Sequence, residues 1–336
     1  MVKFLVIRFS SIGDIVLTTP VVRGLKNQVS RSEIHYLTKP DFAPLLQANP
    51  NISRVHTLAE QPGETIAALR KEGFDYVIDL QNNLRSMYIK RSLKRMYFTV
   101  NKLNIQKWLL VNFKINRLPD KHIVDRYFET TSLFDVKNDG EGLDYFIPEE
   151  EEVGITNLPE PFHKGFIALV IGANHQTKKL PVDHLAELAG KLKNPVIIIG
   201  GPGDKEDAET IVDSLEGKKI LNGCGKWSVN QSASVIRQAN CVITHDTGMM
   251  HISAAFKKKI ITVWGNTIPD FGMYPYQPDP RSVNFEVSGL TCRPCSKLGK
   301  SKCPKKHFRC MLDHDMQNIA ETANKIYEPT EPQTGK

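Results

Sequence analysis

The chain has 336 residues, about twice the usual length of one domain, so we expect two domains. Hydrophobic residues make up 40% of the chain and charged residues 24%, which is typical of a folded globular protein and excludes a disordered one. The formal net charge of +7 favours an anionic partner, whether a substrate, a membrane surface or a nucleic acid. Because no apolar run reaches about 18 residues and no signal-peptide core opens the chain, we expect a cytoplasmic protein without membrane-spanning helices.

Short apolar runs alternate with amphipathic stretches through the first half. We predict strands at residues 3–8, 33–37, 54–58 and 75–80, and helices at 14–28, 42–48, 64–72, from about 84, and at 122–134. The acidic stretch 149–161 contains prolines and has no clear periodicity. It therefore indicates a domain boundary.

The second half restarts the same alternation. We predict strands at 166–171, 196–200, 241–244 and 260–264, and helices at 182–192, 204–215, 230–238, 248–255 and 315–327. This pattern predicts an α/β protein with two Rossmann-like domains, residues 1–155 and 156–327, and a flexible polar tail, 328–336. Ligands of parallel sheets bind at the carboxyl ends of the strands, so we expect the two sheets to face an interdomain cleft.

The loop Arg8-Phe-Ser-Ser-Ile-Gly-Asp14 follows the first predicted strand. Gly13 is expected to let the backbone turn sharply and approach a ligand. Asp14 has two interpretations: an N-cap of the following helix, or a carboxylate that faces the cleft.

Three loops of the second half carry polar groups at strand ends. The turn Asp246-Thr-Gly248 opens a helix, where free N–H groups favour anions, although Asp246 as a simple N-cap is equally consistent. The loop 172–181 places Lys178 and Lys179 before a helix, where lysines can contact phosphate, although at least one of the two is expected to be a solvated loop residue. The glycine-rich turn after residue 199 leads to Glu206, a candidate acceptor for ribose hydroxyls.

Together these motifs resemble glycosyltransferase family 9, the bacterial ADP-heptose:lipopolysaccharide heptosyltransferases. The resemblance covers about residues 1–325 and rests on Ser11-Ile-Gly-Asp14…Thr19-Pro20, Ile78-Asp-Leu-Gln81…Ser86, Lys178…Pro181 and Asp246-Thr-Gly248…His251. It implies a GT-B fold, with the donor nucleotide on the C-terminal domain. It also implies an inverting, metal-independent transfer of a heptose-type sugar from a nucleotide diphosphate, expected to be ADP-heptose, to a lipopolysaccharide core.

The resemblance also implies roles for individual residues. Asp14 matches the catalytic base, Lys178 the diphosphate-binding lysine, and Asp246, Thr247 and Gly248 the donor turn, to which we add Gly13. Glu206 is our choice for the ribose, with Lys205 and Asp207 as alternatives. We expect the acceptor to contact Ser10, Ser11, Gln81 and Arg85.

Basic residues are concentrated between Arg85 and Lys121, where ten lysines and arginines face a single acid, Asp120. A solvated helix face is one interpretation. The lack of compensating acids favours a surface for an anionic glycolipid at the inner membrane surface.

Four of the six cysteines form a cluster, Cys292-x2-Cys295-x7-Cys303-x6-Cys310. This spacing is a candidate for a structural zinc site, but we predict no catalytic metal and commit to no cofactor. Two other functions stay open: a nucleic-acid-binding protein that combines the basic segment with this cluster, and a non-catalytic nucleotide-sugar binder.

Overall fold

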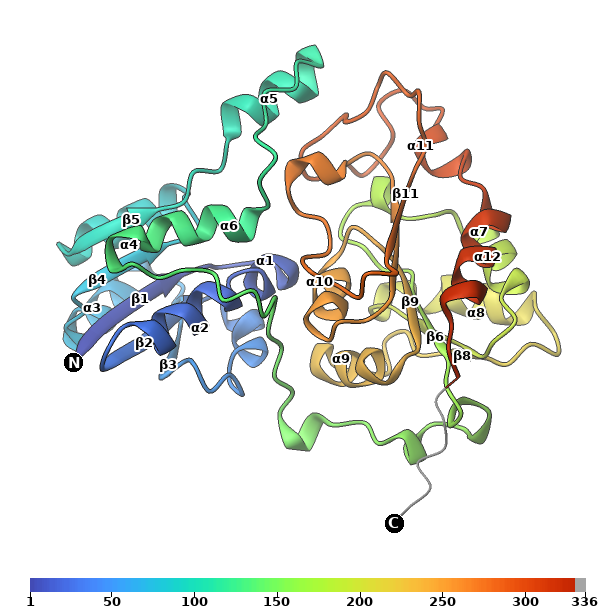
Figure 1. The fold of residues 1–336 in the computed structure, drawn as a ribbon, viewed down its shortest axis with the longest axis horizontal. Coiled ribbons are helices and arrows are strands. Elements are labelled where there is room, and N and C mark those ends of the chain that lie inside the picture. The colour runs from blue at the N-terminus through green and yellow to red at the C-terminus, as the bar shows by residue number, and fades with distance from the viewer. Residues whose placement is uncertain (330–336) are drawn as a thin grey trace. The chain divides into compact units, whose positions relative to one another are not determined.

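The computed structural model describes residues 1–329, and the chain divides into two compact units (Figure 1). Unit 1 comprises Met1–Asn104 and Pro119–Pro148, and unit 2 comprises Ile105–Leu118 and the chain from Glu149 onward. The predicted tail lies outside the described residues except for residues 328 and 329.

Unit 1 is built on a five-stranded parallel sheet. Its strands are β1 (Val2–Ile7), β2 (Ser32–Thr38), β3 (Arg54–Thr57), β4 (Tyr76–Asp79) and β5 (Met96–Thr99). Their order in space is β3-β2-β1-β4-β5, and every neighbouring pair is parallel. This is the Rossmann order 3-2-1-4-5-6 without its sixth strand.

The predicted helix 14–28 is two helices, α1 (Ile12–Val16) and α2 (Thr19–Gln28). Pro20 has no N–H to donate, so the hydroxyl of Thr19 donates to the carbonyl of Val16 instead, at 2.7 Å. The other α-helices of this unit are α3 (Pro62–Glu72), α4 (Leu84–Leu93) and the shorter α6 (Ile123–Phe128).

Unit 2 contains a six-stranded parallel sheet. Its strands are β6 (Ile167–Val170), β7 (Val196–Ile199), β8 (Ile220–Asn222), β9 (Cys241–His245), β10 (Ile260–Trp264) and β11 (Val283–Glu286). The spatial order β11-β10-β9-β6-β7-β8 is the full Rossmann order, read from β6 as the first strand.

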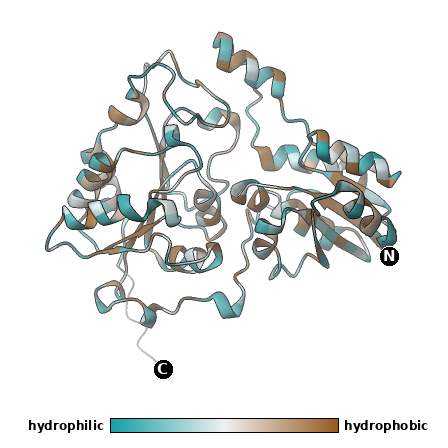
Figure 2. Ribbon diagram, turned by 180° about the vertical axis from the view of Figure 1, so that it is seen from behind, coloured by the Kyte–Doolittle hydropathy of each residue, from teal (hydrophilic) through white to brown (hydrophobic). Residues whose placement is uncertain are grey.

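The helices of unit 2 with seven or more residues are α7 (Val182–Lys191), α8 (Lys205–Asp213), α9 (Val229–Gln238), α10 (Gly248–Ala255) and α12 (Met316–Ile326), together with α5 (Asn104–Phe113) from its second residue onward. The strands are the hydrophobic centre of each unit, while the helices carry polar residues on their outer faces (Figure 2). Within residues 1–329, no helix is long and apolar enough to cross a membrane.

Each sheet has one point at which the strand order reverses direction. In unit 1 it lies between β1 and β4, and in unit 2 between β6 and β9. Open α/β sheets bind ligands outside the carboxyl ends of the strands at such a switch point. The segments that directly follow these four strands contain Asp14, Gln81, Lys178 and Asp246.

Candidate active site

Asp14 is held by an ion pair and two hydrogen bonds at the carboxyl end of β1. Its Oδ1 lies 2.5 Å from Nη2 of Arg8, and its Oδ2 accepts from the backbone N–H and the hydroxyl of Ser11, at 3.0 and 2.9 Å. Ser11 is the N-cap of α1 and Asp14 occupies the third helical position. The interpretation of Asp14 as the N-cap is therefore wrong: Ser11 is the N-cap, and the carboxylate of Asp14 accepts from its backbone N–H as part of a capping box.

The same contacts set the protonation state of Asp14. Burial by itself would raise the pKa of the carboxyl group, but the positive charge of Arg8 and the hydrogen bonds from Ser11 outweigh it and lower the pKa below its usual value. Asp14 is therefore ionised at neutral pH, as a proton acceptor must be. About a fifth of its side chain remains exposed, so a ligand can reach it.

Arg8 connects the loop after β1 to the loop after β4. Its guanidinium donates to the carbonyls of Ser10 and Leu80, at 2.9 and 2.7 Å, and to the hydroxyl of Tyr127 at 3.3 Å. Sequence reasoning gave Arg8 no role, because two of its partners, Leu80 and Tyr127, lie 72 and 119 residues away in the chain. The structure shows that Arg8 is buried directly after β1, where its guanidinium needs internal acceptors.

Three other residues that we assigned to this region from the sequence lie in different environments. Gln81 is buried, and its Oε1 accepts from the backbone of Phe9 at 2.9 Å, so it holds the first loop in place. Arg85 is exposed in the first turn of α4. Gly13 lies inside α1 without a positive φ, so the sharp glycine turn expected there is wrong; the chain turns before it, at residues 8–11.

Lys178 and Asp246 join the two loops at the switch point of unit 2. The Nζ of Lys178 lies 2.6 Å from Oδ2 of Asp246, and the same oxygen accepts from the hydroxyl of Thr267 at 2.8 Å. Both side chains of the ion pair are about 15% exposed. The carboxylate fixes the ammonium group where the two loops meet.

The start of α10 provides a second positive feature in the same unit. Its N-cap is Thr247, whose side chain makes no capping hydrogen bond, and the helix begins at Gly248. The first N–H groups of a helix attract anions, and here no cap side chain occupies them. Asp246 is not the N-cap, which corrects the simpler of its two interpretations.

Lys179, the neighbour of Lys178, pairs not with Asp246 but with a different carboxylate. It forms an ion pair with Asp204, which also accepts from the backbone N–H of Gly201 at 2.8 Å. This turn requires glycine at residue 200, since a Cβ there would lie 2.8 Å from the sulfur of Cys224. Glu206 follows in the first turn of α8 and is exposed.

His245 is a buried residue that sequence reasoning missed. Its Nε2 accepts from the backbone N–H of Leu180 at 3.1 Å, so the end of β9 positions the loop that contains Lys178. Burial, followed by the charge of Lys179, lowers the pKa of His245 to about 3. The imidazole is neutral at physiological pH and can act as this acceptor.

The basic segment consists of residues with different environments. Lys90 is buried and forms an ion pair of 2.7 Å with Asp79, so it is part of the core of unit 1. Lys114 donates to the carbonyls of Cys292 and Pro294, at 3.1 and 2.7 Å. The exposed members include Arg85, Arg91, Lys94, Arg95 and Arg117.

The four clustered cysteines are free thiols: Cys292, Cys295 and Cys303 lie in the loop before the short helix α11 (Arg309–Leu312), and Cys310 lies in that helix. The thiols at 292 and 303 contribute to raising the pKa of Cys295, after burial, so these groups lie near one another. Among the described residues, however, no three of these sulfurs approach within 4.8 Å of one another. The zinc hypothesis for this cluster stays a prediction.

Comparison with known proteins decides the family. A model of glycosyltransferase family 9 (heptosyltransferase) matches residues 64–307, which is more than half of the chain. The chain belongs to glycosyltransferase family 9. It is a glycosyltransferase with the GT-B fold, as the resemblance implied.

Individual relatives agree with this assignment. Lipopolysaccharide heptosyltransferase 1 of Campylobacter coli is 25% identical over 79% of this chain and 84% of its own length. The structure of ADP-heptose lps heptosyltransferase II from E. coli matches with a TM-score of 0.73 at 20% identity, covering 96% of this chain and 98% of that one. An E. coli heptosyltransferase solved with ADP-2-deoxy-2-fluoro heptose matches with a TM-score of 0.65 at 21% identity, covering 85% and 94%.

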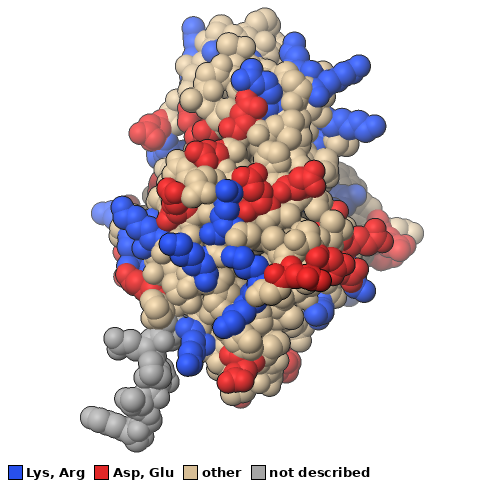
Figure 3. Space-filling model, turned by 90° about the vertical axis from the view of Figure 1, so that its right-hand side faces the viewer, with Lys and Arg blue, Asp and Glu red and all other residues tan. Residues whose placement is uncertain are grey.

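Family membership separates the competing functions. It favours the family 9 transferase over a nucleic-acid-binding protein. On the face drawn in Figure 3, lysine and arginine are interspersed with aspartate and glutamate. A nucleic-acid-binding surface typically gathers one sign of charge instead.

Proposed function

We propose that this family 9 transferase moves a heptose from ADP-heptose to the core of a lipopolysaccharide, with inversion at the anomeric carbon and without a catalytic metal. One observation carries the proposal: a negatively charged side chain lies at the switch point of unit 1, and a positively charged one lies at the switch point of unit 2. Unit 1 holds an ionised carboxylate, Asp14, and unit 2 holds an ammonium group, Lys178, near an uncapped helix N-terminus. A transfer from a nucleotide diphosphate needs a base for the acceptor and positive groups for the leaving group.

The relatives supply the substrates of the proposal. Curated relatives are lipopolysaccharide heptosyltransferases, and a solved relative is complexed with an ADP-heptose analogue. The donor and acceptor proposed here follow from them.

In the proposed reaction, Asp14 accepts the proton of an acceptor hydroxyl as that oxygen bonds to the anomeric carbon. The bond from that carbon to the diphosphate breaks on the opposite side, and ADP leaves with its electron pair. Lys178 and the first N–H groups of α10 stabilise the charge that develops on the leaving phosphate. Arg8 disfavours the protonated form of Asp14, so the proton passes on to solvent.

The exposed basic residues of α4 and its neighbours support an acceptor role for this surface. Arg85, Arg91 and Arg95 would attract the anionic glycolipid and the inner leaflet that holds it, each residue near an anionic bilayer contributing about 1 kcal/mol. We therefore propose a cytoplasmic enzyme that associates peripherally with the membrane.

The decisive experiment combines a donor panel with Asp14→Asn. The purified protein is incubated with ADP-heptose and other sugar nucleotides and with heptose-deficient lipopolysaccharide, and the anomeric configuration of the product is read by NMR. We expect transfer from ADP-heptose with inversion. In Asp14→Asn, we expect a kcat at least about a hundredfold lower with donor affinity nearly unchanged, because only the proton transfer is lost.

Two results would contradict the proposal. If the protein transferred sugar only from a sugar nucleotide other than ADP-heptose, the proposed donor would be wrong. Normal turnover by Asp14→Asn together with a lower melting temperature would make Asp14 a structural residue of the capping box.

A further inference from the structure

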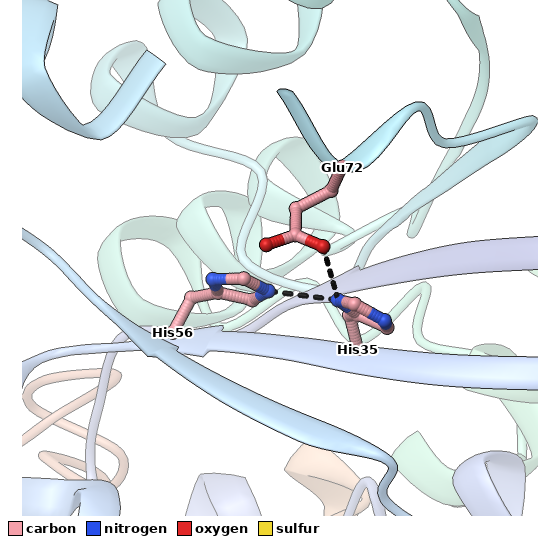
Figure 4. Close-up of side chains that lie close together, drawn as sticks. All are labelled: His35, His56 and Glu72. Carbon is pink, nitrogen blue, oxygen red and sulfur yellow. Dashed lines mark hydrogen bonds and ion pairs between the residues drawn. The ribbon is translucent and has the colours of Figure 1, made fainter. Parts of the chain in front are cut away.

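We propose that unit 1 holds a divalent transition-metal ion, with Zn²⁺ as the reference ion, between His35, His56 and Glu72 (Figure 4). This site lies outside the residues assigned to sugar transfer. Its role is structural.

The three side chains already have the spacing of a metal site. Nδ1 of His35 lies 2.8 Å from Nε2 of His56 and 4.0 Å from Oε2 of Glu72, and one ligand atom of each lies within 4.8 Å of the others. Ligands of a tetrahedral zinc ion at about 2.0–2.1 Å lie about 3.3 Å apart. Among residues 1–329, this is the only group of three or more such ligands with this proximity.

The fold brings the ligands together from three elements. His35 lies on β2, His56 on the edge strand β3, and Glu72 is the last residue of α3. In the parallel register Leu37 pairs with His56, and His35 pairs with Arg54, so the two histidines are diagonal neighbours on one face. No ligand is closer than 16 residues to the next along the chain, which is why sequence spacing gave no signal.

The ligand atoms are oriented by residues around them. Nε2 of His35 lies 2.8 Å from Oε1 of Glu33, and donation to this carboxylate leaves Nδ1 with a lone pair that faces His56 and Glu72. Arg54 binds Oε1 of Glu72 at 2.7 Å, so Oε2 is the oxygen directed to the histidines. A carboxylate behind a histidine and a salt bridge behind a carboxylate are typical supports of metal ligands.

The surroundings favour a cation as well. Glu72 ends α3, and the C-terminal end of a helix carries partial negative charge. The ring of Phe74 packs edge-on against both imidazoles, at centroid distances of 5.1 and 6.2 Å, and limits their rotation. His35 is 1% exposed, which protects the site on one side.

Two histidines and one carboxylate are ligands that suit zinc and related first-row ions. Three protein ligands leave one position for water. The ion would fasten the edge strand β3 to β2 and to the end of α3, a part of the sheet that is otherwise held from one side only.

Cobalt binding to the metal-free full-length protein tests the site, because Co²⁺ reports its ligands by absorption. Chelator-treated protein is titrated with Co²⁺ and then with Zn²⁺. We expect visible d–d bands of a nitrogen–oxygen site, displaced by Zn²⁺, and a higher melting temperature with Zn²⁺. Thiolate-to-cobalt bands would instead report the cysteine cluster.

Variants distinguish the two candidate sites. His56→Gln and Glu72→Gln should each weaken the affinity that gives the nitrogen–oxygen bands by at least tenfold, while Cys303→Ser should leave it unchanged. Glu33→Gln should weaken it by about 10–100-fold, as expected for a residue that orients a ligand. Absence of these bands in the parent protein, or unchanged affinity in His56→Gln with its fold intact by circular dichroism, would overturn the proposal and leave a hydrogen-bonded histidine pair.

Discussion

Asp14 and Lys178, the two charged residues with the most direct proposed roles, each have an opposite charge within their own unit. Arg8 keeps Asp14 ionised, and Asp246 holds the ammonium group of Lys178 between two loops. Each partner fixes a side chain that would otherwise sample many rotamers. A fixed geometry before the substrate arrives lowers the cost of binding it.

We predict that Lys178→Ala weakens ADP binding by at least tenfold and leaves AMP binding within about twofold. A charge-assisted hydrogen bond is typically worth about 1.5–3 kcal/mol, and the variant also leaves Asp246 without its cation, so that this carboxylate repels the diphosphate. Isothermal titration calorimetry with both nucleotides measures the effect.

Two further variants serve as controls for this prediction. Lys178→Ala combined with Asp246→Asn should recover part of the lost affinity. Lys179→Ala removes an equivalent charge that is paired with Asp204 and should change the ADP-to-AMP ratio little. A larger effect at Lys179 would transfer the assignment to that residue.

At the scale of elements, α4 combines two kinds of basic residue within ten positions. Lys90 points into unit 1, where it bonds Asp79 at 2.7 Å and the hydroxyl of Thr99 at 2.6 Å, and so ties α4 to β4 and β5. Arg85 and Arg91 are exposed. Within the basic segment, the buried Lys90 therefore stabilises the fold, whereas the exposed Arg85 and Arg91 are available to bind the acceptor.

We predict that Lys90→Met destabilises the protein by about 3–5 kcal/mol. The side chain of Asp79 is fully buried, and removal of its cation leaves an unpaired charge, although hydrogen bonds from Gln81, Asn82 and Ser86 remain. Urea unfolding measures the loss, and Arg91→Met is the exposed control on the same helix. A loss below about 1 kcal/mol would mean that those three hydrogen bonds suffice for Asp79.

We predict that replacing Arg85, Arg91 and Arg95 together by Glu raises the acceptor KM and abolishes binding to anionic vesicles, with ADP affinity unchanged. Lys94 is left intact because it has a positive φ of 53°. The control replaces Lys164, Lys193 and Lys219, exposed on unit 2, by Glu and changes the net charge equally. If both triple variants changed the acceptor KM and vesicle binding equally, the basic segment would act only through the net charge of the protein and not as a specific binding surface.

At the scale of the whole molecule, the buried His245 and the paired Asp14 give the stability of the fold a dependence on pH. His245 is neutral in the folded state, with its pKa lowered to about 3 by burial and then by Lys179, against about 6.5 when unfolded. The unfolded chain therefore binds an extra proton below about pH 6.5, and stability decreases as the pH falls toward the folded pKa. The lowered pKa of Asp14 adds a loss that begins only below about pH 4.

We predict that the free energy of unfolding is nearly constant from pH 8 to 7 and falls below about pH 6.5, with His245 contributing up to about 1.4 kcal/mol per pH unit. His245→Gln keeps an acceptor for the N–H of Leu180 and should reduce the slope between pH 6.5 and 4. Urea titrations at a series of pH values measure it. If the free energy of unfolding of the variant changed with pH as steeply as that of the parent protein, His245 would not be the group that causes the pH dependence.

The sequence by itself determined the fold class, most of the central strands and the loops that carry Asp14, Lys178 and Asp246, because alternating buried strands and helices leave a periodic record in the chain. It missed the edge strands β5, β8 and β11, since edge strands are short and partly exposed and so show no apolar run. Tertiary structure alone decided which polar groups meet: Arg8 with the carbonyl of Leu80 and the hydroxyl of Tyr127, Lys178 with Asp246, and His35 with His56 and Glu72. Most of these partners are tens of residues apart, and it is the parallel order of the strands that brings them within a hydrogen bond or a salt bridge of one another.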